Sequence, residues 1–225
     1  LKTKEGELAA AKASVEEQVA AKVKAERQAI VAEEAMKARL LAASDIEQKS
    51  EELVELLNQY LTAMTEVIFE NGGYVDKYMG DGIMAIFGMD APAADGASKA
   101  LVAARAMGGV LDSLNQSLRD ELRVPLSMGI GIHSGSAILG RIGAANRTES
   151  VARLTALGET VNIASRLESK TKELGVQVAV SARCIATSGL VPGDRITPLT
   201  VEIRGLSDSI AIYTVARATD LPAPN

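Results

Sequence analysis

The sequence YVDKYMGDGIMAIFG, residues 74–88, decides the fold of this chain. Its two ends, Tyr74–Met79 and Ile83–Phe87, have the pattern of short β-strands, and Gly80-Asp81-Gly82 stands between them. A short Gly/Asp link between two such segments is typical of a β-hairpin. The glycines allow close approach of a ligand, and an exposed carboxylate between them suits a hard cation such as Mg²⁺ or Mn²⁺. Because Gly-Asp-Gly is also common turn chemistry, the tripeptide alone leaves a metal ligand and an ordinary turn both open.

Helical and extended patterns alternate on both sides of this hairpin. The expected helices are Glu51–Glu70, Ala97–Leu118, Glu159–Leu174 and the short Ala182–Thr187. The expected strands outside the hairpin are Arg39–Ile46, Leu126–Ile132, Ala137–Ile142, Val176–Val180, and a closing pair, Val201–Arg204 with Ile210–Val215. This order predicts an α+β fold, in which helices pack on a mainly antiparallel sheet.

The composition changes near residue 38. Residues 1–37 are rich in Ala, Glu and Lys and contain no Pro, which favours a helix. Their apolar residues recur at spacings of seven, four, four and seven, at Leu8, Val15, Val19, Val23 and Ile30. This pattern is typical of one helical stripe, so we expect either a parallel coiled coil or a single solvated helix. The chain is therefore expected to consist of an N-terminal helical stalk, residues 1–37, and a folded domain, residues 38–220.

Charge and hydropathy exclude several classes of protein. A net charge of −5 and a pI of about 5.1 argue against a nucleic-acid-binding protein, which usually has a basic face. No apolar run approaches the roughly 20 residues of a membrane span, and no signal-peptide pattern opens the chain. Because the chain begins with helical character, we expect a cytoplasmic fragment of a longer protein. An upstream sensor and a membrane anchor are both left open.

The single cysteine and the single histidine are expected to be structural. Cys184 cannot form an internal disulfide, which fits a reducing cytoplasm. Neither Cys184 nor His133 has the neighbouring partners that a nucleophile or a metal ligand would need. The chain contains no GxxxxGK[ST] sequence, which excludes a P-loop nucleotide site.

Three further side chains suit a site for a phosphorylated ligand. Asp45 ends the first expected strand, so Asp45 and Asp81 at neighbouring strand ends would clamp two metal ions on one triphosphate. Asp45 is equally placed to cap the helix that follows. Asn162 and Arg166 are four residues apart on one helix face, where an amide and a guanidinium would hold a ribose and a phosphoryl group. An ordinary surface arginine paired with an acid is the alternative for Arg166.

Three glycine-containing segments follow one another along the chain: VDKYMGDGIMAIFG (75–88), MGIGIHSGSAILGRIG (128–143) and LGETVNIASRLES (157–169). Together they resemble the signature of the class III adenylate and guanylate cyclases, and the resemblance covers most of residues 38–216. It implies a ferredoxin-like α+β core and a head-to-tail homodimer with two active sites, each built from both subunits. It also implies that the ribose 3′-hydroxyl of a nucleoside triphosphate attacks its own α-phosphate, giving a 3′,5′-cyclic nucleotide and pyrophosphate.

The resemblance also implies roles for single residues. Asp81 matches the metal-binding aspartate of the hairpin. Asp45 with the Ile46 carbonyl matches the other metal position, because the segment before them is similar to the family's apolar strand ending in Asp-Ile. The family therefore implies two divalent cations, Mg²⁺ or Mn²⁺. Asn162 and Arg166 match the pair that orients the ribose and stabilises the transition state.

Two residues match the positions that read the purine base. Lys77 occupies a position where adenylate cyclases carry Lys and guanylate cyclases carry Glu, and Thr155 occupies its partner position. A Lys donor and a Thr hydroxyl serve N1 and N6 of adenine, whereas N1–H and N2 of guanine would need an acceptor. The expected function is therefore an adenylate cyclase that acts on ATP. The alternatives are a guanylate cyclase, or a catalytically silent cyclase-like module for dimerisation or nucleotide sensing.

The chain departs from the family pattern in two regions that bear on phosphate and metal binding. Asp45 and Asp81 are only 36 positions apart (81 minus 45), and residues 47–50 run directly into the next helix where the family has a Gly-Phe-Thr segment. Either part of the metal and phosphate loop is lacking, or a stretch is absent from the sequence. The glycine of the closing pair is followed by Leu206 instead of a lysine, which leaves Arg204 as the substitute phosphate-binding residue.

Overall fold

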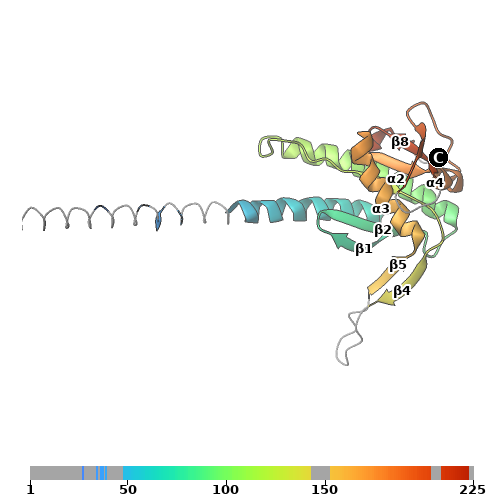
Figure 1. Ribbon diagram of the computed structural model, residues 1–225, viewed down its shortest axis with the longest axis horizontal. Helices are drawn as coiled ribbons and strands as arrows, with labels where there is room; N and C mark the ends of the chain where they lie inside the picture. Colours follow the sequence, from blue (N-terminus) through green and yellow to red (C-terminus); the bar gives the residue numbers. More distant parts are fainter. Residues whose placement is uncertain are drawn as a thin grey trace, which may run out of the picture. The chain divides into compact units, whose positions relative to one another are not determined.

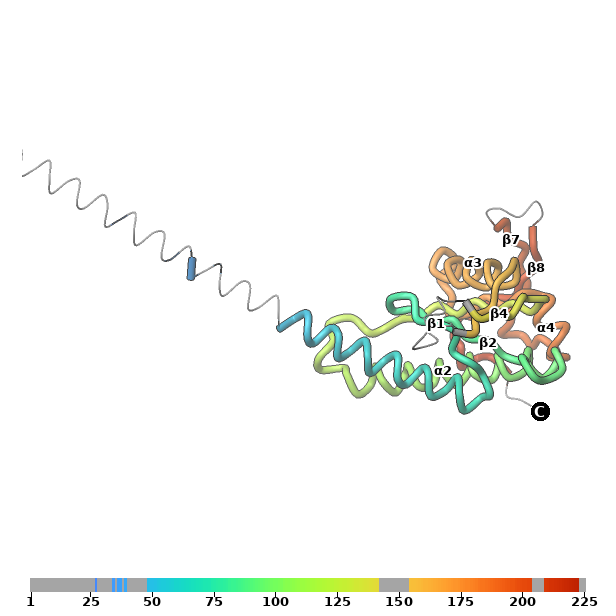
Figure 2. Tube along the Cα trace, turned by 90° about the horizontal axis from the view of Figure 1, so that it is seen from below, coloured from blue at the N-terminus to red at the C-terminus, as the bar shows by residue number. Residues whose placement is uncertain are grey.

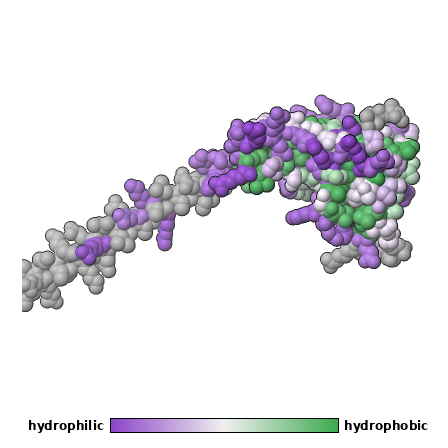
Figure 3. Space-filling model, turned by 90° about the horizontal axis from the view of Figure 1, so that it is seen from above, coloured by the Kyte–Doolittle hydropathy of each residue, from purple (hydrophilic) through white to green (hydrophobic). Residues whose placement is uncertain are grey.

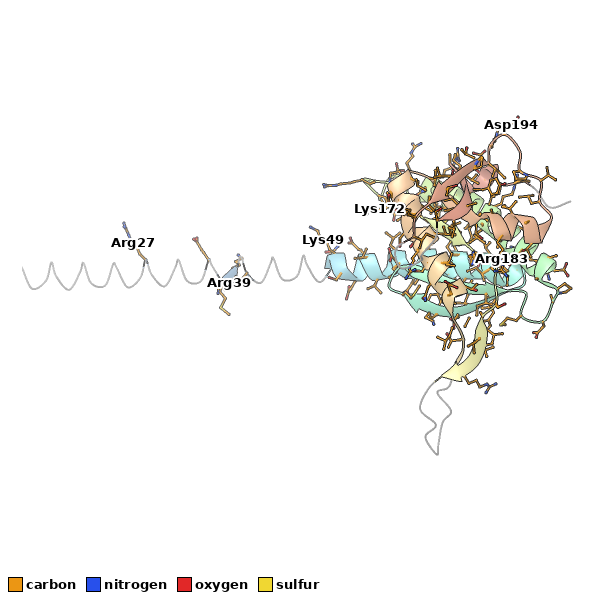
Figure 4. The ribbon with its side chains drawn as sticks, turned by 45° about the vertical axis from the view of Figure 1, so that its right-hand side comes forward. Arg27, Arg39, Lys49, Lys172, Arg183 and Asp194 are labelled. Carbon is orange, nitrogen blue, oxygen red and sulfur yellow. The ribbon has the colours of Figure 1, made fainter. Side chains whose placement is uncertain are left out.

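The computed structural model describes residues 48–142, 153–203 and 209–222, and residues 27, 34, 36, 37 and 39. The chain divides into two compact units, Leu1–Leu56 and Leu57–Asn225. All described residues of the first unit are helical, among them Arg27 and Arg39, which are labelled in Figure 4. In the described part of the chain, we find no helix with the length and apolar character of a membrane span.

One expected strand is wrong at the residue where it is described. Arg39 is helical, although the pattern of residues 39–46 predicts a strand beginning there. Arginine is a good helix former and follows the helical Met36 and Lys37, so helix propensity outweighs the short apolar stretch at this point. Residues 40–46 and most of the expected stalk lie outside the described residues.

The second unit mixes helices and strands (Figure 1). It begins with the helical residues 57–70, and residues 48–56 of the first unit are helical too, which confirms the helix expected over Glu51–Glu70. The other helices are α2 (Ala93–Ser117), α3 (Glu159–Leu174), α4 (Ala182–Ser188) and the 3-10 turn η1 (Ala218–Asp220). The strands are β1 (Gly73–Met79), β2 (Gly82–Phe87), β3 (Ile130–Ile132), β4 (Ile138–Ile142), β5 (Arg153–Leu157), β6 (Val178–Ser181), β7 (Thr197–Val201) and β8 (Ile210–Val215). Among the described strands only β3 and β6 pair in parallel, so the expected α+β fold with mainly antiparallel pairing is confirmed.

A four-stranded sheet lies between two layers of helix. Its strand order is β3-β6-β8-β7, with α2 and α4 on one face and α3 on the other (Figure 2). Successive side chains of β6 point to opposite faces. Val178 and Val180 are buried in the cluster that includes α2 and α4, whereas Ala179 is buried with Ile163 and Leu167 of α3. The sheet therefore has an apolar core on each side.

The remaining strands form two separate antiparallel pairs, β1–β2 and β4–β5. The expected hairpin is confirmed, with Met79 opposite Gly82 across the turn. The strand β5 is not among the expected strands, although its residues RLTAL begin with a short polar–apolar alternation. Its extended state comes from pairing with β4, from Ile138 opposite Leu157 to Ile142 opposite Arg153.

Two strands, β3 and β7, lie farthest from the limits that the sequence predicts. β3 begins at Ile130 and not at Leu126, because the Asn115 side chain binds the backbone of Leu126. Its oxygen accepts from the Leu126 N–H at 2.7 Å, and its NH₂ donates to the Leu126 carbonyl at 2.9 Å. β7 ends at Val201, where the expected strand begins. Its sequence TPLTV is largely polar and contains Pro198, which fits an edge strand of a sheet.

Helix α3 packs directly on the backbone of β3. A Cβ atom added at Gly131 would lie 2.2 Å from the Ala164 carbonyl oxygen and 2.2 Å from the Glu168 amide nitrogen. A Cβ at Gly129 would lie 2.0 Å from Thr171 Oγ1. Both glycines lie on one face of the segment 128–132, so this face has no side chains and the helix fills the space they would occupy.

We expect Gly131→Ala to destabilise the domain by about 3 kcal/mol, because the new methyl group meets helix backbone that has no side-chain freedom to move. Gly140→Ala on β4 is the matched control, since a Cβ there meets no described atom within 4 Å. Urea unfolding measures both variants, and the control is expected to change by less than about 0.5 kcal/mol. Equal stability of the two variants would contradict the packing described here.

Candidate active site

The β1–β2 hairpin contains a bulge at Asp76. Regular pairing ends at Val75 opposite Ala85 and resumes at Lys77 opposite Met84, so Asp76 is the extra residue. In a regular strand, neighbouring side chains point to opposite faces. A bulge re-aims the side chains around it, which lets Asp76 and Lys77 reach the same residue on β5.

Thr155 of β5 is the residue that Lys77 and Asp76 share. Lys77 Nζ donates a hydrogen bond to Thr155 Oγ1 at 2.8 Å, and Thr155 Oγ1 donates to Asp76 Oδ2 at 2.8 Å. Lys77 Nζ also lies 3.1 Å from Asp76 Oδ2. The Tyr74 hydroxyl donates to the Leu154 carbonyl at 3.4 Å, a second contact between β1 and β5. The fold thus joins Lys77 and Thr155, the two residues named from the sequence for base reading, across 78 positions of chain.

Asp76 is the member of this group that sequence analysis missed. Its side chain is 1% exposed, whereas that of Lys77 is 41% exposed. The second carboxylate oxygen, Oδ1, is buried and has no hydrogen-bond partner in the described structure. A signal was present, since Asp is depleted in strands and is seldom fully buried. An acid within a strand and directly before the lysine therefore pointed to a buried polar group.

Asp81 lies in the turn of the hairpin and is exposed. Gly80 before it has a φ of 67°, a left-handed conformation that favours glycine. The Asp81 carboxylate forms no hydrogen bond or ion pair with the residues that the structure describes. Those residues also contain no group of three or more His, Cys, Asp or Glu that would hold a metal ion. An Mg²⁺ ion that binds substrate phosphates needs only one or two carboxylates, so Asp81 fits such an ion as one ligand.

Tyr60 lies in the electric field of two carboxylates, Asp81 in the hairpin and Glu168 on helix α3. Burial raises the pKa of Tyr60, and the negative charges of Asp81 and of Glu168 on α3 raise it further. The phenol therefore keeps its proton at neutral pH and stays a hydrogen-bond donor in the field of two carboxylates.

Asn162 and Arg166 lie one turn apart on α3, beside the face that packs on the sheet. Their neighbours Ile163 and Leu167 are buried, whereas Asn162 is exposed and Arg166 is half-buried. Neither polar side chain has a hydrogen bond or an ion pair with the described residues. The alternative of an ion pair for Arg166 is therefore not formed within this part of the chain. An amide and a guanidinium are both available to a ligand or to a second chain.

Three residues named from the sequence lie outside the described structure. They are Asp45 and Ile46, expected to hold metal with Asp81, and Arg204, expected to bind phosphate. Their roles stay predictions.

His133 has the character of a structural residue. It is half-buried, and its buried Nδ1 has no hydrogen-bond partner in the described structure. Burial lowers the pKa of His133, and the positive charge of Arg183 (Figure 4) lowers it further, against an opposite effect of Glu159. The imidazole is therefore neutral at pH 7, and it belongs to no metal-binding group among the described residues.

Comparison with known proteins identifies similar sequences over most of the chain. Residues 38–213 match the family described as "Adenylate and Guanylate cyclase catalytic domain". The adenylate cyclase of Anabaena cylindrica is 35% identical over 171 residues, which are 73% of this chain and 32% of that protein. Adenylate cyclase 1 of Rhizobium meliloti is 33% identical over 168 residues, 73% of this chain and 24% of that protein. This chain thus spans about a third or less of the length of these relatives.

Solved structures with the same fold include both purine specificities. The adenylyl cyclase CyaB from P. aeruginosa superposes with a TM-score of 0.63 and 29% identity, covering 77% of this chain and 86% of that one. The guanylyl cyclase Cya2 superposes with a TM-score of 0.63 and 32% identity, covering 74% and 81%. The expected fold of the domain is therefore confirmed. Overall similarity to these structures does not separate ATP from GTP.

We expect Cys184 to be unreactive in the folded protein. It is 1% exposed in the core between the sheet and α4, and burial raises the pKa of its thiol to about 11. At pH 8 only about one thiol in a thousand would then be ionised. An aromatic disulfide reagent that releases a coloured thiolate should react at pH 8 very slowly with the native protein. It should react fully with the protein unfolded in urea. Rapid stoichiometric labelling of the native protein would contradict the structural role of Cys184.

Proposed function

The chain belongs to the adenylate and guanylate cyclase catalytic domain family, and on that premise we propose that it converts ATP into 3′,5′-cyclic AMP and pyrophosphate. The observation that carries this choice is the 2.8 Å hydrogen bond between Lys77 and Thr155. A lysine ammonium only donates, so it suits N1 of adenine, which is an acceptor, and is a poor partner for N1–H of guanine. Thr155 then faces the amino group at position 6.

The proposed site uses two divalent cations, held by Asp81 together with Asp45 and the Ile46 carbonyl. Family membership supports the use of divalent metal, and the exposed, unpaired carboxylate of Asp81 supports its place as a ligand. When bound, such ions activate the ribose 3′-hydroxyl and neutralise charge on the departing pyrophosphate. The carboxylates would hold these cations, because a bare carboxylate repels a triphosphate, and Arg204 is proposed to bind the outer phosphates.

Asn162 and Arg166 are proposed to complete the site from α3. The amide of Asn162 holds the ribose, which keeps the 3′-hydroxyl in line with the α-phosphate. The guanidinium of Arg166 donates to the oxygens that gain charge as the P–O bond to pyrophosphate breaks. Their lack of partners in the described structure supports this role, because a side chain already bound elsewhere would have to be released first.

We propose that the enzyme is a homodimer with composite active sites. An exposed apolar surface supports a second copy as the partner. Ile138 and Leu157 lie directly opposite each other on one face of the β4–β5 pair and are 72% and 46% exposed, and Leu139, on the other face of the pair, is 43% exposed. Apolar surface is visible as green on the folded unit in Figure 3. Contiguous exposed apolar residues on a paired strand commonly mark a protein interface.

The stalk is proposed to couple this domain to a longer protein. Both curated relatives are more than twice as long as this chain, which supports an upstream sensor or membrane domain, with the cyclase domain in the cytoplasm. We propose residues 1–37 as the stalk and residues 38–220 as the catalytic domain. A dimeric helix that shifts or rotates would change how two catalytic halves face each other and so set activity.

We expect the protein with Mn²⁺ to form cyclic AMP from ATP much faster than cyclic GMP from GTP, measured side by side by chromatography. Lys77→Glu should lower the preference for ATP at least about tenfold, because a carboxylate at position 77 accepts where lysine donates. Total turnover should fall as well, since the new carboxylate would face the buried Asp76. A preference of the unchanged protein for GTP would establish the guanylate cyclase alternative. No product from either nucleotide would favour the silent module.

We expect two inactive variants to restore activity when they are mixed. Asp81→Asn removes a metal ligand and Arg166→Ala removes the charge on α3, and each should lower kcat by about 100-fold or more. If each site takes Asp81 from one subunit and Arg166 from the other, a mixed dimer contains one intact site. Equal mixing should then recover about one quarter of the original activity. Recovery no greater than the sum of the two variants would place both residues in one subunit's site.

A further inference from the structure

We infer that Asp76 is a positioning residue that holds the Thr155 hydroxyl as a hydrogen-bond acceptor and thereby makes the base site selective for a 6-aminopurine. The inference rests on the proposed function, in which Lys77 and Thr155 read the base. It adds a third residue, and it assigns the selectivity at position 6 of the purine to the direction of one hydrogen bond.

The chemistry of the three groups sets the direction of each hydrogen bond. A carboxylate accepts only and an ammonium donates only, whereas a hydroxyl has one O–H and two lone pairs. The 2.8 Å contact of Thr155 with Asp76 therefore uses the hydroxyl proton. The 2.8 Å contact of Lys77 with Thr155 uses one lone pair of the hydroxyl oxygen. One lone pair is left, so Thr155 can offer a ligand an acceptor and nothing else.

Lys77 keeps donor capacity for a ligand. Its ammonium group has three N–H bonds, of which one is used in the hydrogen bond to Thr155 Oγ1, and its charge is paired with Asp76 Oδ2 at 3.1 Å. The side chain is 41% exposed, so a remaining N–H is available to a ligand. The pair thus presents one donor beside one acceptor, which matches N1 and the 6-amino group of adenine.

Without Asp76 the Thr155 hydroxyl would lose this directionality. A free hydroxyl rotates to suit its partner, so it would accept from an amino group or donate to an oxygen at position 6 equally well. When Asp76 holds the hydroxyl proton, the Thr155 oxygen presents a lone pair to the ligand. An oxygen at position 6 of the purine would be repelled by it, because both atoms are acceptors. Selection against an oxygen at this position therefore depends on Asp76, which has no need to touch the base.

The burial of Asp76 supports a functional reason for its presence. The side chain is 1% exposed, and its Oδ1 has no hydrogen-bond partner in the described structure. Leaving a buried polar atom unpaired destabilises the folded state. A buried carboxylate that is paired with a half-exposed lysine and keeps an unsatisfied oxygen is poor evidence for a stabilising role, because replacing such charged groups by apolar residues of similar volume often leaves the stability unchanged or raises it. The bulge at Asp76 also interrupts the regular strand pairing at this position.

The test compares ATP with 6-methoxypurine riboside triphosphate, which replaces the 6-amino donor by an oxygen acceptor and keeps N1 as an acceptor. GTP is a weaker probe, because guanine changes positions 1, 2 and 6 together. The readout is the ratio of kcat/KM for the two nucleotides, measured on one preparation of each variant. This ratio does not depend on how much of the preparation is folded, so a loss of stability alone leaves it unchanged.

We expect kcat/KM of the unchanged protein to be about 10- to 100-fold higher for ATP than for the 6-methoxy nucleotide. ATP gains one hydrogen bond to Thr155, whereas the methoxy oxygen is left facing an acceptor. Asp76→Leu should bring the ratio to within about threefold, because the hydroxyl can then donate to the methoxy oxygen. Asp76→Ala is measured in parallel, since it removes the same acceptor without an apolar side chain of similar size. Thr155→Val should lower the ratio of kcat/KM to the same extent. Adding Asp76→Leu to Thr155→Val should not change the ratio further.

Asp76→Asn should keep most of the selectivity, because its amide oxygen still accepts the Thr155 proton and the Lys77 donor. Asp112→Asn is the matched control. It makes the same chemical change in an exposed ion pair with Arg217 outside this site, and it should leave the ratio unchanged. Selectivity that survives in both Asp76→Leu and Asp76→Ala would overturn the inference. The inference would also be overturned if Asp76→Asn lost as much selectivity as Asp76→Leu. The charge of Asp76, and not its position as a hydrogen-bond acceptor, would then decide the selectivity.

The outcome also separates this inference from the proposed function. If the unchanged protein forms cyclic AMP but its ratio does not respond to Asp76, the role of Asp76 fails and the cyclase assignment stands. If the unchanged protein forms no cyclic nucleotide from ATP with Mn²⁺, the proposed function fails and takes the role of Asp76 with it.

Discussion

The approach of α3 to the bare backbone of β3 is the contact on which the arrangement of this domain depends. Gly129 and Gly131 leave room for the helix to lie directly against the strand. Helix α3 starts at Glu159, only two positions after the end of β5, so the same contact limits where Thr155 lies. One backbone contact therefore relates the amide and guanidinium of α3 to the hydrogen-bonded Lys77 and Thr155 between β1 and β5. Side chains on the glycine face of β3 would move both halves of the site.

The site combines polar groups of two kinds. Asn162 and Arg166 are unpaired in the described structure and available to a ligand, whereas Asp76, Lys77 and Thr155 are bound to one another before any ligand arrives. The second kind is pre-organised, so little side-chain freedom is lost when a base binds. The arrangement leaves one buried oxygen of Asp76 without a described partner. A domain of this size with a core on each face of its sheet can tolerate such a local loss of stability.

Local pattern predicted the elements that carry their own signals. Helix α3 has the expected limits, Glu159 and Leu174, because Gly158 and Gly175 bound a clear apolar repeat. The hairpin strands differ from expectation by one residue at most, because a glycine-rich turn stands between them. Strand β5 was missed, since its extended state comes from pairing with β4. The start of β3 was placed too early, because the Asn115 side chain, distant in sequence, takes the backbone groups of Leu126. In the site, the sequence paired Lys77 with Thr155, and the structure joins the two by a hydrogen bond. The buried Asp76, which binds Thr155, was not expected.

The sequence by itself determined which chemical groups this protein has, their spacing along each element and the family to which they belong. Turn glycines, apolar periods and motif order are local properties, so they can be read without a structure. Only the tertiary structure decided that Asp76 lies buried beneath Lys77 and Thr155 and which of its oxygens is used. That outcome depends on a register shift in one pair of strands and on the packing of β1 beside β5, 78 positions away. Such contacts arise from the summed packing of distant segments, so the residues on either side indicate at most that a polar group is buried and not what it binds.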